Sequence, residues 1–461
     1  MSEVEQKELP ENWEMVALQS VISLKKGKMP QDLGDKSGKR NIPYIDIKAF
    51  ETGEIRRYCT DEKVVLCKDD DVLVVWDGSR SGLVGFGAKG AVGSTIAKVD
   101  PSGFDSKYMY YFLQSNYTYL NTNTRGVGIP HVDPIIFNNL EFPVIPLEQQ
   151  KRIVAKIEEL FSHIDAGIEA LKKAKQLLKQ YRQSVLKAAV TGELTKEWRE
   201  ENKDKFEPAS QLLERILKER RQKWEQQQLE QFKAKGKIPK DDKWKVKYKE
   251  PKAPALKVDI KYPEEWELVS IDQVAEVLLG KMLDKSKHTT GEKLPYLRNI
   301  NVRWGHVATN DVSEMFFKEG ELERYNLISG DVLVCEGGEP GRASVWYDEI
   351  PNMKYQKALH RVRFYLPLVP EYLSILLEYF ASTGLLTRYF TGSTIKHFTK
   401  ESFISLPFPL PELVEMEKIV ELVDEKITNI QRLEKEIDVQ LLKVERNKQS
   451  ILSSAFSGRV N

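Results

Sequence analysis

The repetition in this chain is clearest around one stretch, which reads Leu140-Glu-Phe-Pro-Val-Ile-Pro-Leu-Glu-Gln-Gln-Lys-Arg-Ile-Val154. It belongs to a longer segment, Gly126 to Leu194, that recurs 266 residues later without a gap. About 17 of the 69 paired positions are identical, including Phe142-Pro143 with Phe408-Pro409 and Ile153-Val154 with Ile419-Val420. A gapless match of this length indicates a true internal repeat, which constrains the whole fold.

The repeat extends toward the N-terminus of each copy. Three further pairs of segments match: Pro10–Leu18 with Pro263–Ile271, Pro43-Tyr44 with Pro295-Tyr296, and Asp71–Val74 with Asp331–Val334. The loop Gly126-Val-Gly-Ile-Pro-His131 likewise matches Gly392-Ser-Thr-Ile-Lys-His397. Each copy begins with about 135 residues rich in Val, Ile, Tyr, Phe and Gly, with strand-like runs such as Val72–Trp76 and Val332–Cys335. These runs predict a domain of mixed secondary structure at the start of each copy.

Each copy ends in a predicted long helix. Apolar residues recur at the spacing of a coiled-coil seam. The steps are of three and four, with one step of seven at the end of the second series, at 157, 161, 164, 168, 171, 174, 178, 181, 185 and 188, and at 423, 427, 430, 433, 437, 441, 444 and 451. Pro146 and Pro411 lie near the starts, and Gly192 and Gly458 lie just past the ends. Each helix spans roughly 42 residues, or about 60 Å.

One amphipathic helix cannot bury its apolar stripe alone, but two in one chain can bury theirs against each other. We therefore expect an antiparallel helix pair with a globular domain at each end. The alternative, that each helix packs on its own domain or recruits partner chains, stays open. The predicted fold is α+β: two mixed α/β domains separated by two long antiparallel coiled-coil helices and related by a pseudo-two-fold axis. The predicted boundaries are 1–145, 146–192, 193–262, 263–410 and 411–461.

The segment 193–262 has no counterpart in the other copy. Gln211–Phe232 predicts a charged helix, and Lys233–Pro254 has the Lys-rich, Pro-punctuated composition of a linker. A solvated linker is one interpretation of this segment. Contact with the DNA backbone or with a partner subunit is the other.

The composition narrows the class of protein. The chain has 461 residues, of which 41% are hydrophobic, and 70 Lys and Arg balance 69 Asp and Glu, so any basic surface must be local. No apolar run is long enough for a membrane span, and the N-terminus lacks a secretion signal. Cys59, Cys67 and Cys335 form neither a disulfide framework nor a CxxC metal pattern. We expect a cytoplasmic protein with reduced thiols and no membrane contact.

These patterns resemble a known family. The order domain–helix–domain–helix, with Leu140–Val154 opening the first helix and Ser184–Leu194 closing it, is similar to the specificity subunits of type I restriction-modification enzymes. Gly78-Ser79 and Gly93–Ala97 also resemble segments of that family's target-recognition domains. The resemblance covers nearly the whole chain. The second helix departs from the family pattern at Glu415-Met416-Glu417, which leaves the partner contacts of that helix open.

The resemblance implies a function. Residues 1–145 and 263–410 become target-recognition domains, each reading one half of a split double-stranded DNA target, and the helices set the unread gap. The subunit binds two methyltransferase subunits, which carry S-adenosylmethionine and methylate adenine, and restriction subunits then join to translocate and cut DNA. It also implies that ATP and Mg²⁺ belong to those partner subunits, and that this chain holds no cofactor and has no catalysis of its own.

The residues themselves indicate no active site. An adenine methyltransferase needs an Asn/Asp-Pro-Pro-aromatic loop for the flipped base, and Asp133-Pro134-Ile-Ile lacks the second proline and the aromatic residue. Gly85-Phe-Gly-Ala-Lys-Gly90 matches G-x-G-x-x-G, but strand-like sequence follows it where a cofactor site needs a helix, so we interpret it as a hairpin or loop. There is no P-loop motif, and the six histidines have no paired spacing, so we predict no metal site.

Basic residues gather on predicted glycine-rich loops in both copies, where they could reach DNA. The candidate contacts are Lys25, Lys26, Lys28, Lys39, Arg40, Arg80, Lys89, Arg125, His131, Lys281, Lys285, Lys287, Arg303, Arg342, Lys396 and His397. The four arginines at 80, 125, 303 and 342 are the better candidates for base readout, because a guanidinium binds guanine through two hydrogen bonds. Any single lysine could instead be a solvated surface charge. His131 and His397 could instead make structural hydrogen bonds, and Trp13 and Trp266 are expected in the cores.

The two domains share a frame and differ in these loops, as at Arg56-Arg57 and Arg303-Trp304. Unlike loops predict unlike half-sites and hence an asymmetric target. Three other functions stay open: a specificity chain in an orphan or non-classical DNA methyltransferase system, a coiled-coil scaffold that binds no DNA, and an enzyme in its own right. The neighbouring genes would distinguish an orphan or non-classical methyltransferase system from a type I restriction-modification system. Salt-dependent DNA binding would exclude the scaffold that binds no DNA.

Overall fold

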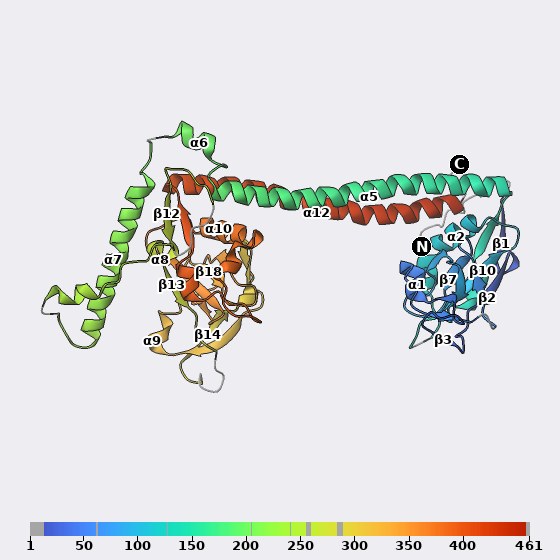
Figure 1. The fold of residues 1–461 in the computed structure, drawn as a ribbon, viewed down its shortest axis with the longest axis horizontal. Helices are drawn as coiled ribbons and strands as arrows, with labels where there is room; N and C mark the ends of the chain where they lie inside the picture. The colour runs from blue at the N-terminus through green and yellow to red at the C-terminus, as the bar shows by residue number, and fades with distance from the viewer. Residues whose placement is uncertain are drawn as a thin grey trace, which may run out of the picture. The chain divides into compact units, whose positions relative to one another are not determined.

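The computed structural model describes residues 13–60, 63–126, 128–203, 205–239, 241–254, 260–283 and 289–457. The chain divides into two compact units: the first unit is Met1–Ala174 with Glu436–Asn461, and the second unit is Lys175–Lys435. Helices α5 (Leu147–Val190) and α12 (Leu413–Phe456) each contribute residues to both units (Figure 1). The fold is mixed α and β, as predicted.

Each unit is built on a four-stranded antiparallel sheet with the same strand order. In the first unit the order is β2 (Ile22–Lys26), β10 (Ile96–Pro101), β7 (Val72–Val75) and β8 (Val84–Phe86). In the second unit it is β13 (Ala275–Leu279), β21 (Leu359–Phe364), β18 (Val332–Cys335) and β19 (Ala343–Val345). Helix α2 (Ser106–Ser115) packs on the first sheet and α10 (Pro370–Ser382) on the second. The repeat seen in the sequence is therefore a repeat of topology.

A two-stranded ribbon joins the start of each copy to the start of its long helix. Strand β1 (Glu14–Ala17) pairs with β11 (Glu141–Val144), and β12 (Glu267–Ser270) pairs with β22 (Pro407–Leu410). The repeated Phe-Pro pair has a structural explanation here. Both phenylalanines, Phe142 and Phe408, are fully buried. Both proline carbonyls accept a hydrogen bond from a buried tyrosine, Tyr108 to Pro143 at 3.2 Å and Tyr372 to Pro409 at 3.0 Å.

The units diverge in their second sheets. The first unit has five strands in the order β3 (Leu33–Gly34), β5 (Tyr58–Cys59), β4 (Ile42–Ile45), β9 (Gly90–Val92) and β6 (Leu66–Cys67). The second has β17 (Ser313–Phe317), β14 (Glu292–Leu297) and β20 (Lys354–Tyr355), with a separate hairpin of β15 (Val302–Arg303) and β16 (His306–Val307). The motif Gly85–Gly90 connects β8 to β9 and starts no helix, which confirms the hairpin-or-loop interpretation.

Short helices complete both units. The first unit contains α1 (Ile47–Thr52), α3 (Tyr117–Thr122) and α4 (Pro134–Asn138), and the second contains α8 (Ile271–Val274), α9 (Glu319–Leu322) and α11 (Lys400–Ile404). The cores of the two units include the predicted tryptophans. Trp266 is buried in the second unit, and Trp13 is half-buried against the core of the first. No helix among the described residues is long and apolar enough to cross a membrane.

The long helices have 44 residues each and begin and end 266 positions apart, so the helical half of the repeat is gapless in structure too. In the first unit, the end of α12 joins the globular core through Leu452, Ala455 and Phe456. The Phe456 ring lies 5.1 Å from the ring of Tyr108 and 5.6 Å from that of Phe112. This unit is therefore completed by residues from the far end of the sequence.

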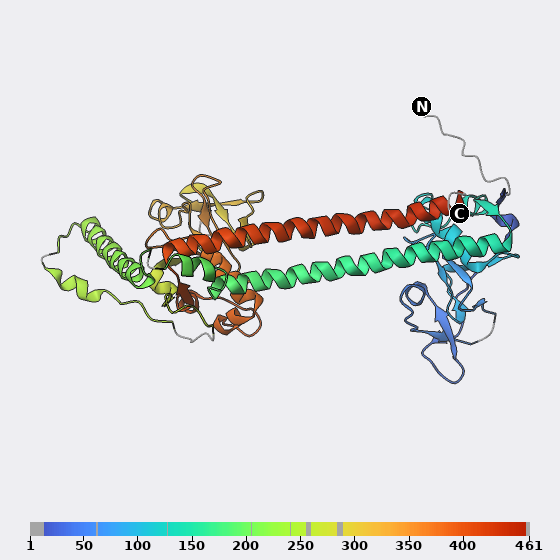
Figure 2. The same ribbon diagram turned by 90° about the horizontal axis from the view of Figure 1, so that it is seen from above.

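Within each unit, the early part of one long helix lies beside the late part of the other, so the two segments are antiparallel (Figure 2). In the first unit, Lys448 of α12 pairs with Asp165 of α5 at 2.5 Å. Most predicted seam residues between the helix ends are half-buried, which fits a two-stranded pairing. The seam prediction was wrong at Tyr181 and Leu433, which are 47% and 39% exposed. Gly192 ends α5 with a φ of 70°, a left-handed conformation that favours glycine, whereas Gly458 lies outside the described residues.

The starts of the two long helices are anchored differently. In α5, buried Gln150 accepts a hydrogen bond from the N–H of Asp105 at 2.9 Å and donates to the carbonyl of Ile145 at 2.8 Å. In α12 the buried polar residue is Glu415, at the position where the sequence departs from the family pattern. Its carboxylate accepts hydrogen bonds from Thr195 at 2.7 Å, from Trp266 at 2.8 Å and from Arg199. The departure thus ties α12 to residues that follow α5.

The segment without a counterpart is structured. It contains α6 (Lys196–Glu201), α7 (Ala209–Ala234) and the 3₁₀ turn η2 (Asp242–Lys247). The first half of α7 lies against α8 and β12 of the second unit (Figure 1), where Ala209, Leu212 and Ile216 are buried. The expected charged helix is present, and it is anchored to the second unit.

Candidate nucleic-acid interface

The repeated glycine–histidine loop is closed by the same backbone pairing in both units. Arg125 and His131 exchange two backbone hydrogen bonds of 2.8 Å, and Thr391 and His397 exchange two of 2.9 Å. The glycines that open the loops, Gly126 and Gly392, have φ values of 104° and 90°. A Cβ at Gly392 would lie 2.2 Å from a backbone oxygen, so this tight turn requires glycine. The sequence pattern Gly-x-x-Ile-x-His therefore encodes a closed, exposed loop.

In the first unit, three of the predicted contact regions meet at this loop. The N–H of Gly78 donates to the carbonyl of Pro130 at 2.8 Å, which brings the turn carrying Arg80 against the loop. Nδ1 of His131 lies 2.7 Å from Asp77, and the other carboxylate oxygen of Asp77 lies 2.7 Å from the ammonium of Lys26. The end of β2, the Gly78 turn and the histidine loop therefore form one surface.

The carboxyl group of Asp77 holds this surface together. Burial by itself would raise the pKa of Asp77, but the hydrogen bonds from Lys26 and His131 outweigh it and hold the pKa below its usual value. Asp77 is therefore ionised at neutral pH and orients the side chains of both Lys26 and His131. His131 therefore makes a structural hydrogen bond, which was one of the two roles considered for it. Even so, 44% of its side chain remains exposed.

The matching position in the second unit carries no carboxylate. Gly337 stands where Asp77 stands, since the N–H of Phe398 donates to the carbonyl of Glu336 just as Val132 donates to Trp76. Among the described residues, no hydrogen bond to the ring of His397 replaces the one that Asp77 makes to His131. The two histidines thus share a backbone site and differ in their electrostatic surroundings.

The exposed candidates of the first unit are Lys25, Lys26, Lys28, Lys39, Arg80, Lys89 and Arg125. Arg80, whose side chain is 58% exposed, pairs with Glu51. Arg40 is turned back toward its own loop, where it binds Asp32 at 2.7 Å. Contacts among the described residues do not link Lys39 or Lys89 to the surface around His131.

Two candidates in the second unit are buried, and their environments contradict the expected DNA contact. Lys281 is 3% exposed, and its ammonium binds Glu321 at 2.5 Å and the carbonyl of Phe316 at 2.7 Å. Lys281 occupies the position of Lys28 in the first unit, because the preceding glycines, Gly280 and Gly27, make equivalent backbone hydrogen bonds. The backbone of Lys281 also pairs with Gln356, and this pairing accompanies the buried position of its side chain.

Arg342 is the second such residue, at 9% exposed. It pairs with Glu339 and donates to the carbonyl of Asn299 at 2.9 Å. The turn in this unit is one residue shorter, so Arg342 matches Leu83 at the start of a strand and not Arg80 at the tip of the turn. Aligning Gly82 with Gly341, which both have a φ near 90°, would have revealed this.

The other candidates in the second unit lie at its surface. Arg303 is exposed on the β15–β16 hairpin. Lys396 and His397 are exposed, and the Lys396 ammonium donates to the carbonyl of Gly392 at 2.9 Å within the loop. Lys285, Lys287 and the neighbouring His288 lie outside the described residues. The described residues contain no group of three or more His, Cys, Asp or Glu side chains placed to hold a metal ion.

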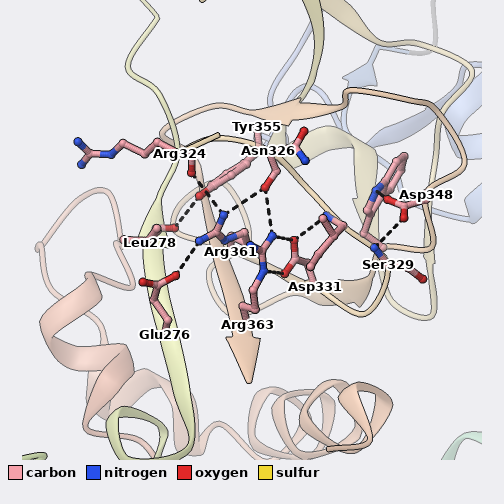
Figure 3. Close-up of polar contacts among 12 residues, drawn as sticks. Glu276, Leu278, Arg324, Asn326, Ser329, Asp331, Asp348, Tyr355, Arg361 and Arg363 are labelled. Atoms are coloured by element: carbon pink, nitrogen blue, oxygen red, sulfur yellow. Dashed lines mark hydrogen bonds and ion pairs between the residues drawn. The ribbon is translucent and has the colours of Figure 1, made fainter. Parts of the chain in front are cut away.

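A buried ionic network, which sequence reasoning missed, lies within the sheet of the second unit (Figure 3). Arg363 binds Asp331 through two hydrogen bonds of 2.7 and 2.6 Å, and Asp331 is 1% exposed. Its neighbour Arg361, 3% exposed, binds Glu276 at 2.8 Å and the carbonyl of Asn326 at 3.1 Å. These contacts link β21 to β13 and to the segment that leads into β18, so they fix the sheet that carries the loops.

The first unit has a simpler version of this network, in which Lys98 pairs with Asp71 at 2.6 Å. Asp71 and Asp331 also accept a hydrogen bond from the backbone N–H three residues earlier, Lys68 at 2.7 Å and Ile328 at 2.9 Å. The repeated Asp-Val-Leu-Val sequence therefore combines a turn cap with an ion pair.

His360 supports the second histidine loop from inside the protein. It is fully buried on β21, and its Nε2 lies 2.7 Å from the carbonyl of Phe398, next to His397. Burial lowers the pKa of His360 from its ordinary 6.5 to about 4. Ala97 occupies the equivalent position in the first unit, because it pairs with Val74 as His360 pairs with Val334. The internal repeat therefore gave no signal for this histidine.

We expect His360 to make the second unit acid-sensitive. Between pH 6.5 and pH 4 the unfolded chain binds a proton that the folded chain excludes, so this contribution to stability is complete above pH 6.5 and is lost as the pH falls toward 4. The loss amounts to about 1.4 kcal/mol per pH unit at most. Urea unfolding at pH 7.5 and pH 5 should show that His360→Gln is less pH-dependent than the native chain; parallel profiles would contradict this.

Comparison with known proteins identifies the relatives of this chain. The family model for the type I restriction modification DNA specificity domain matches residues 10–179 and 263–443. The type I restriction enzyme MjaVIII specificity subunit of Methanocaldococcus jannaschii is 26% identical over 98% of this chain and 94% of its own length. The EcoKI specificity subunit of Escherichia coli K12 is 23% identical over 98% and 90%.

Two solved structures have the same fold. The HsdS subunit from Thermoanaerobacter tengcongensis matches with a TM-score of 0.55 at 18% identity, over 99% of both chains. A chain from a structure that describes complex assembly and conformational transition of the type I R-M system matches with a TM-score of 0.63 at 18% identity, over 98% of this chain and all of that one.

Proposed function

The chain belongs to the family of the type I restriction modification DNA specificity domain and is a type I DNA specificity subunit, and we propose that each of its units reads one half of a split, asymmetric duplex target. One observation carries this proposal: a shared backbone loop presents different side chains in the two units. Arg125 and Asp77 in the first unit stand where Thr391 and Gly337 stand in the second. A shared frame with unlike contact groups suits two different base sequences.

The partners in this proposal are double-stranded DNA, two methyltransferase subunits and restriction subunits. The methyltransferase subunits bring S-adenosylmethionine and the restriction subunits bring ATP and Mg²⁺, so this chain contributes recognition and no catalytic group. The long helices are the proposed docking surface for the methyltransferase subunits. Leu177 and Leu442, which are 54% and 62% exposed on these helices, support this assignment, because exposed leucines gain stability when a partner covers them.

The experiment that tests the function is methylation mapping. The chain is expressed with its methyltransferase partner, and methylated adenines are located by long-read sequencing. We expect a recognition word of two unlike parts separated by unread bases. A single uninterrupted word or a palindrome would refute the proposal, and a chain without salt-dependent DNA binding would be a protein scaffold instead.

We expect Arg80→Ala to relax recognition in one half of the target only. A base contact through its exposed guanidinium is worth about 1–3 kcal/mol of discrimination, whereas a phosphate contact would weaken binding equally for all sequences. Arg303→Ala, on the exposed hairpin of the second unit, should affect the other half. Competition binding with targets mutated in either half distinguishes these outcomes, and relaxation of both halves by Arg80→Ala would refute the assignment.

A further inference from the structure

The segment without a counterpart in the repeat carries a concentrated positive charge. Residues 218–252, which we call the basic arm, contain 13 Lys and Arg and 6 Asp and Glu, a net charge of +7. The whole chain has a net charge of +1, so the other residues sum to −6. The basic arm therefore holds more than the entire positive excess of the protein. This concentration of positive charge lies outside the glycine–histidine loops of both units and outside the two long helices.

The basic arm is a built hairpin attached to the second unit (Figure 1). Arg220 joins both of its limbs to α8: it donates to the Asp272 carbonyl at 3.1 Å, to the Tyr248 hydroxyl at 2.6 Å and to the Lys249 carbonyl at 3.1 Å. On the returning limb, the carbonyl of Lys252 accepts a hydrogen bond from Ser270 at 2.7 Å. These contacts fix the base of the hairpin against β12 and α8.

Aromatic side chains hold the two limbs together. Trp224 of α7 stacks on Trp244 of η2 with ring centroids 5.8 Å apart, and Tyr248 meets Trp224 edge-on at 5.3 Å. Phe232 closes the cluster against Trp244 at 6.1 Å. Because these rings contact one another, they are not available to stack on unpaired bases, which is how proteins hold single-stranded nucleic acid.

The charges of the basic arm fall into two groups. Its arginines at 220 and 221 are engaged internally: Arg220 as described, and Arg221 with Glu225 at 3.2 Å. In contrast, seven exposed lysines of the arm make no ion pair among the described residues, and five of these lie within residues 233–249: Lys233, Lys235, Lys237, Lys247 and Lys249. The unneutralised charge is therefore carried by lysine alone. Lysine binds phosphate as a point charge and lacks the planar fork that reads guanine.

We propose that the basic arm binds the sugar–phosphate backbone of duplex DNA, adding affinity without sequence preference; this inference rests on the proposed DNA-reading function. The unpaired lysines match an anionic polymer, the engaged arginines exclude bidentate base readout, and the engaged rings exclude stacking. A protein partner fits less well, because the core of a protein–protein interface is depleted in lysine. The five lysines lie at 233, 235, 237, 247 and 249, so their positive charges are concentrated within 17 residues of the arm.

The test uses the full-length chain with all five lysines changed to Gln, and the same five changed to Arg as the charge-matched control. Affinity for the specific duplex and for an unrelated duplex is measured from 50 to 200 mM salt. For the Gln variant we expect about tenfold weaker binding or more at 100 mM salt, equally for both duplexes, and a slope of log K against log salt that is shallower by about two or more. The Arg variant should bind like the native chain.

Several outcomes would overturn the proposal. An unchanged salt slope in the Gln variant would show that the lysines touch no phosphate, and a loss confined to the specific duplex would make the arm a base reader. A second variant, Ile238→Ser with Val246→Ser, replaces apolar side chains that are 89% and 85% exposed on the arm. If it weakens subunit assembly while the Gln variant binds DNA normally, the arm docks on protein. If the native chain shows no preference for the specific duplex, the proposed function fails, whatever the arm does.

Discussion

Duplicating residues 171–174 in α5 and 432–435 in α12 lengthens the unread gap of the target by between one and two base pairs. Four helical residues add about 6 Å, and successive base pairs of B-DNA rise 3.4 Å. Four residues also turn the helix by about 400°, within about 40° of one full turn, so the half-buried seam keeps its orientation. The insertion points lie beside the boundaries of the two units, which α5 and α12 both cross.

The measurement is methylation mapping of the native and the doubly extended chain with the same methyltransferase partner. The sequences of the two half-sites should be unchanged, because no loop is altered. Two controls make the test sharp. Extending only one helix should impair assembly, since the two helices would differ in length. Inserting two residues in each helix turns the seam by about 200° and should impair it too. An extended chain with the native gap would refute the proposal that the helices set the spacing.

The second large effect is expected from Asp331→Ala in the ionic network of the second unit. Asp331 is 1% exposed and accepts two hydrogen bonds from Arg363 and one from the N–H of Ile328. Removing it leaves the guanidinium of Arg363, which is half-buried, without its counter-charge, which costs about 3–5 kcal/mol of unfolding free energy. Asp331→Asn keeps an acceptor for the turn but not the charge, so its cost should be smaller.

The repeat supplies a matched control for this prediction. Asp71 has the same turn cap and pairs with Lys98, but its side chain is 17% exposed, whereas that of Asp331 is fully buried. Asp71→Ala should therefore cost less, about 1–2 kcal/mol, because Asp71 accepts one hydrogen bond from its cation where Asp331 accepts two, and the flexible Lys98 side chain can extend its ammonium toward water. The midpoints of urea unfolding, followed by circular dichroism on the full-length chain, compare the two. Equal losses would show that the burial of the carboxylate and its second hydrogen bond to the cation do not set the cost.

The sequence was informative about the fold because repetition and periodicity are local properties of the chain. A constant offset of 266 located both long helices, and their observed ends at Leu147, Val190, Leu413 and Phe456 keep that offset. Glycines also carried local information, since Gly126, Gly192 and Gly392 all adopt positive φ where a turn or a helix end was expected. Such signals depend on neighbouring residues, so one sequence contains them.

The candidate site was less predictable, because it depends on contacts between residues far apart in the sequence. Asp77 and His131 are 54 positions apart, and only the folded sheet brings them together. Lys281 and Arg342 were placed among the DNA contacts by their glycine neighbours, yet Glu321 and Glu339 hold them inside. A basic residue beside a glycine indicates a turn, but the side of the turn on which its side chain lies is decided by tertiary structure.

The way α12 completes the first unit bears on how the protein is made. On the ribosome, the globular part of this unit is translated early, but Leu452, Ala455 and Phe456, which pack against Phe112 and Tyr108, follow more than 300 residues later. At about 5–20 residues per second, the nascent chain waits roughly 15–60 s for them. During translation this apolar surface stays uncovered, so it is a natural point of attachment for chaperones, whereas the second unit emerges as one uninterrupted block and can fold first.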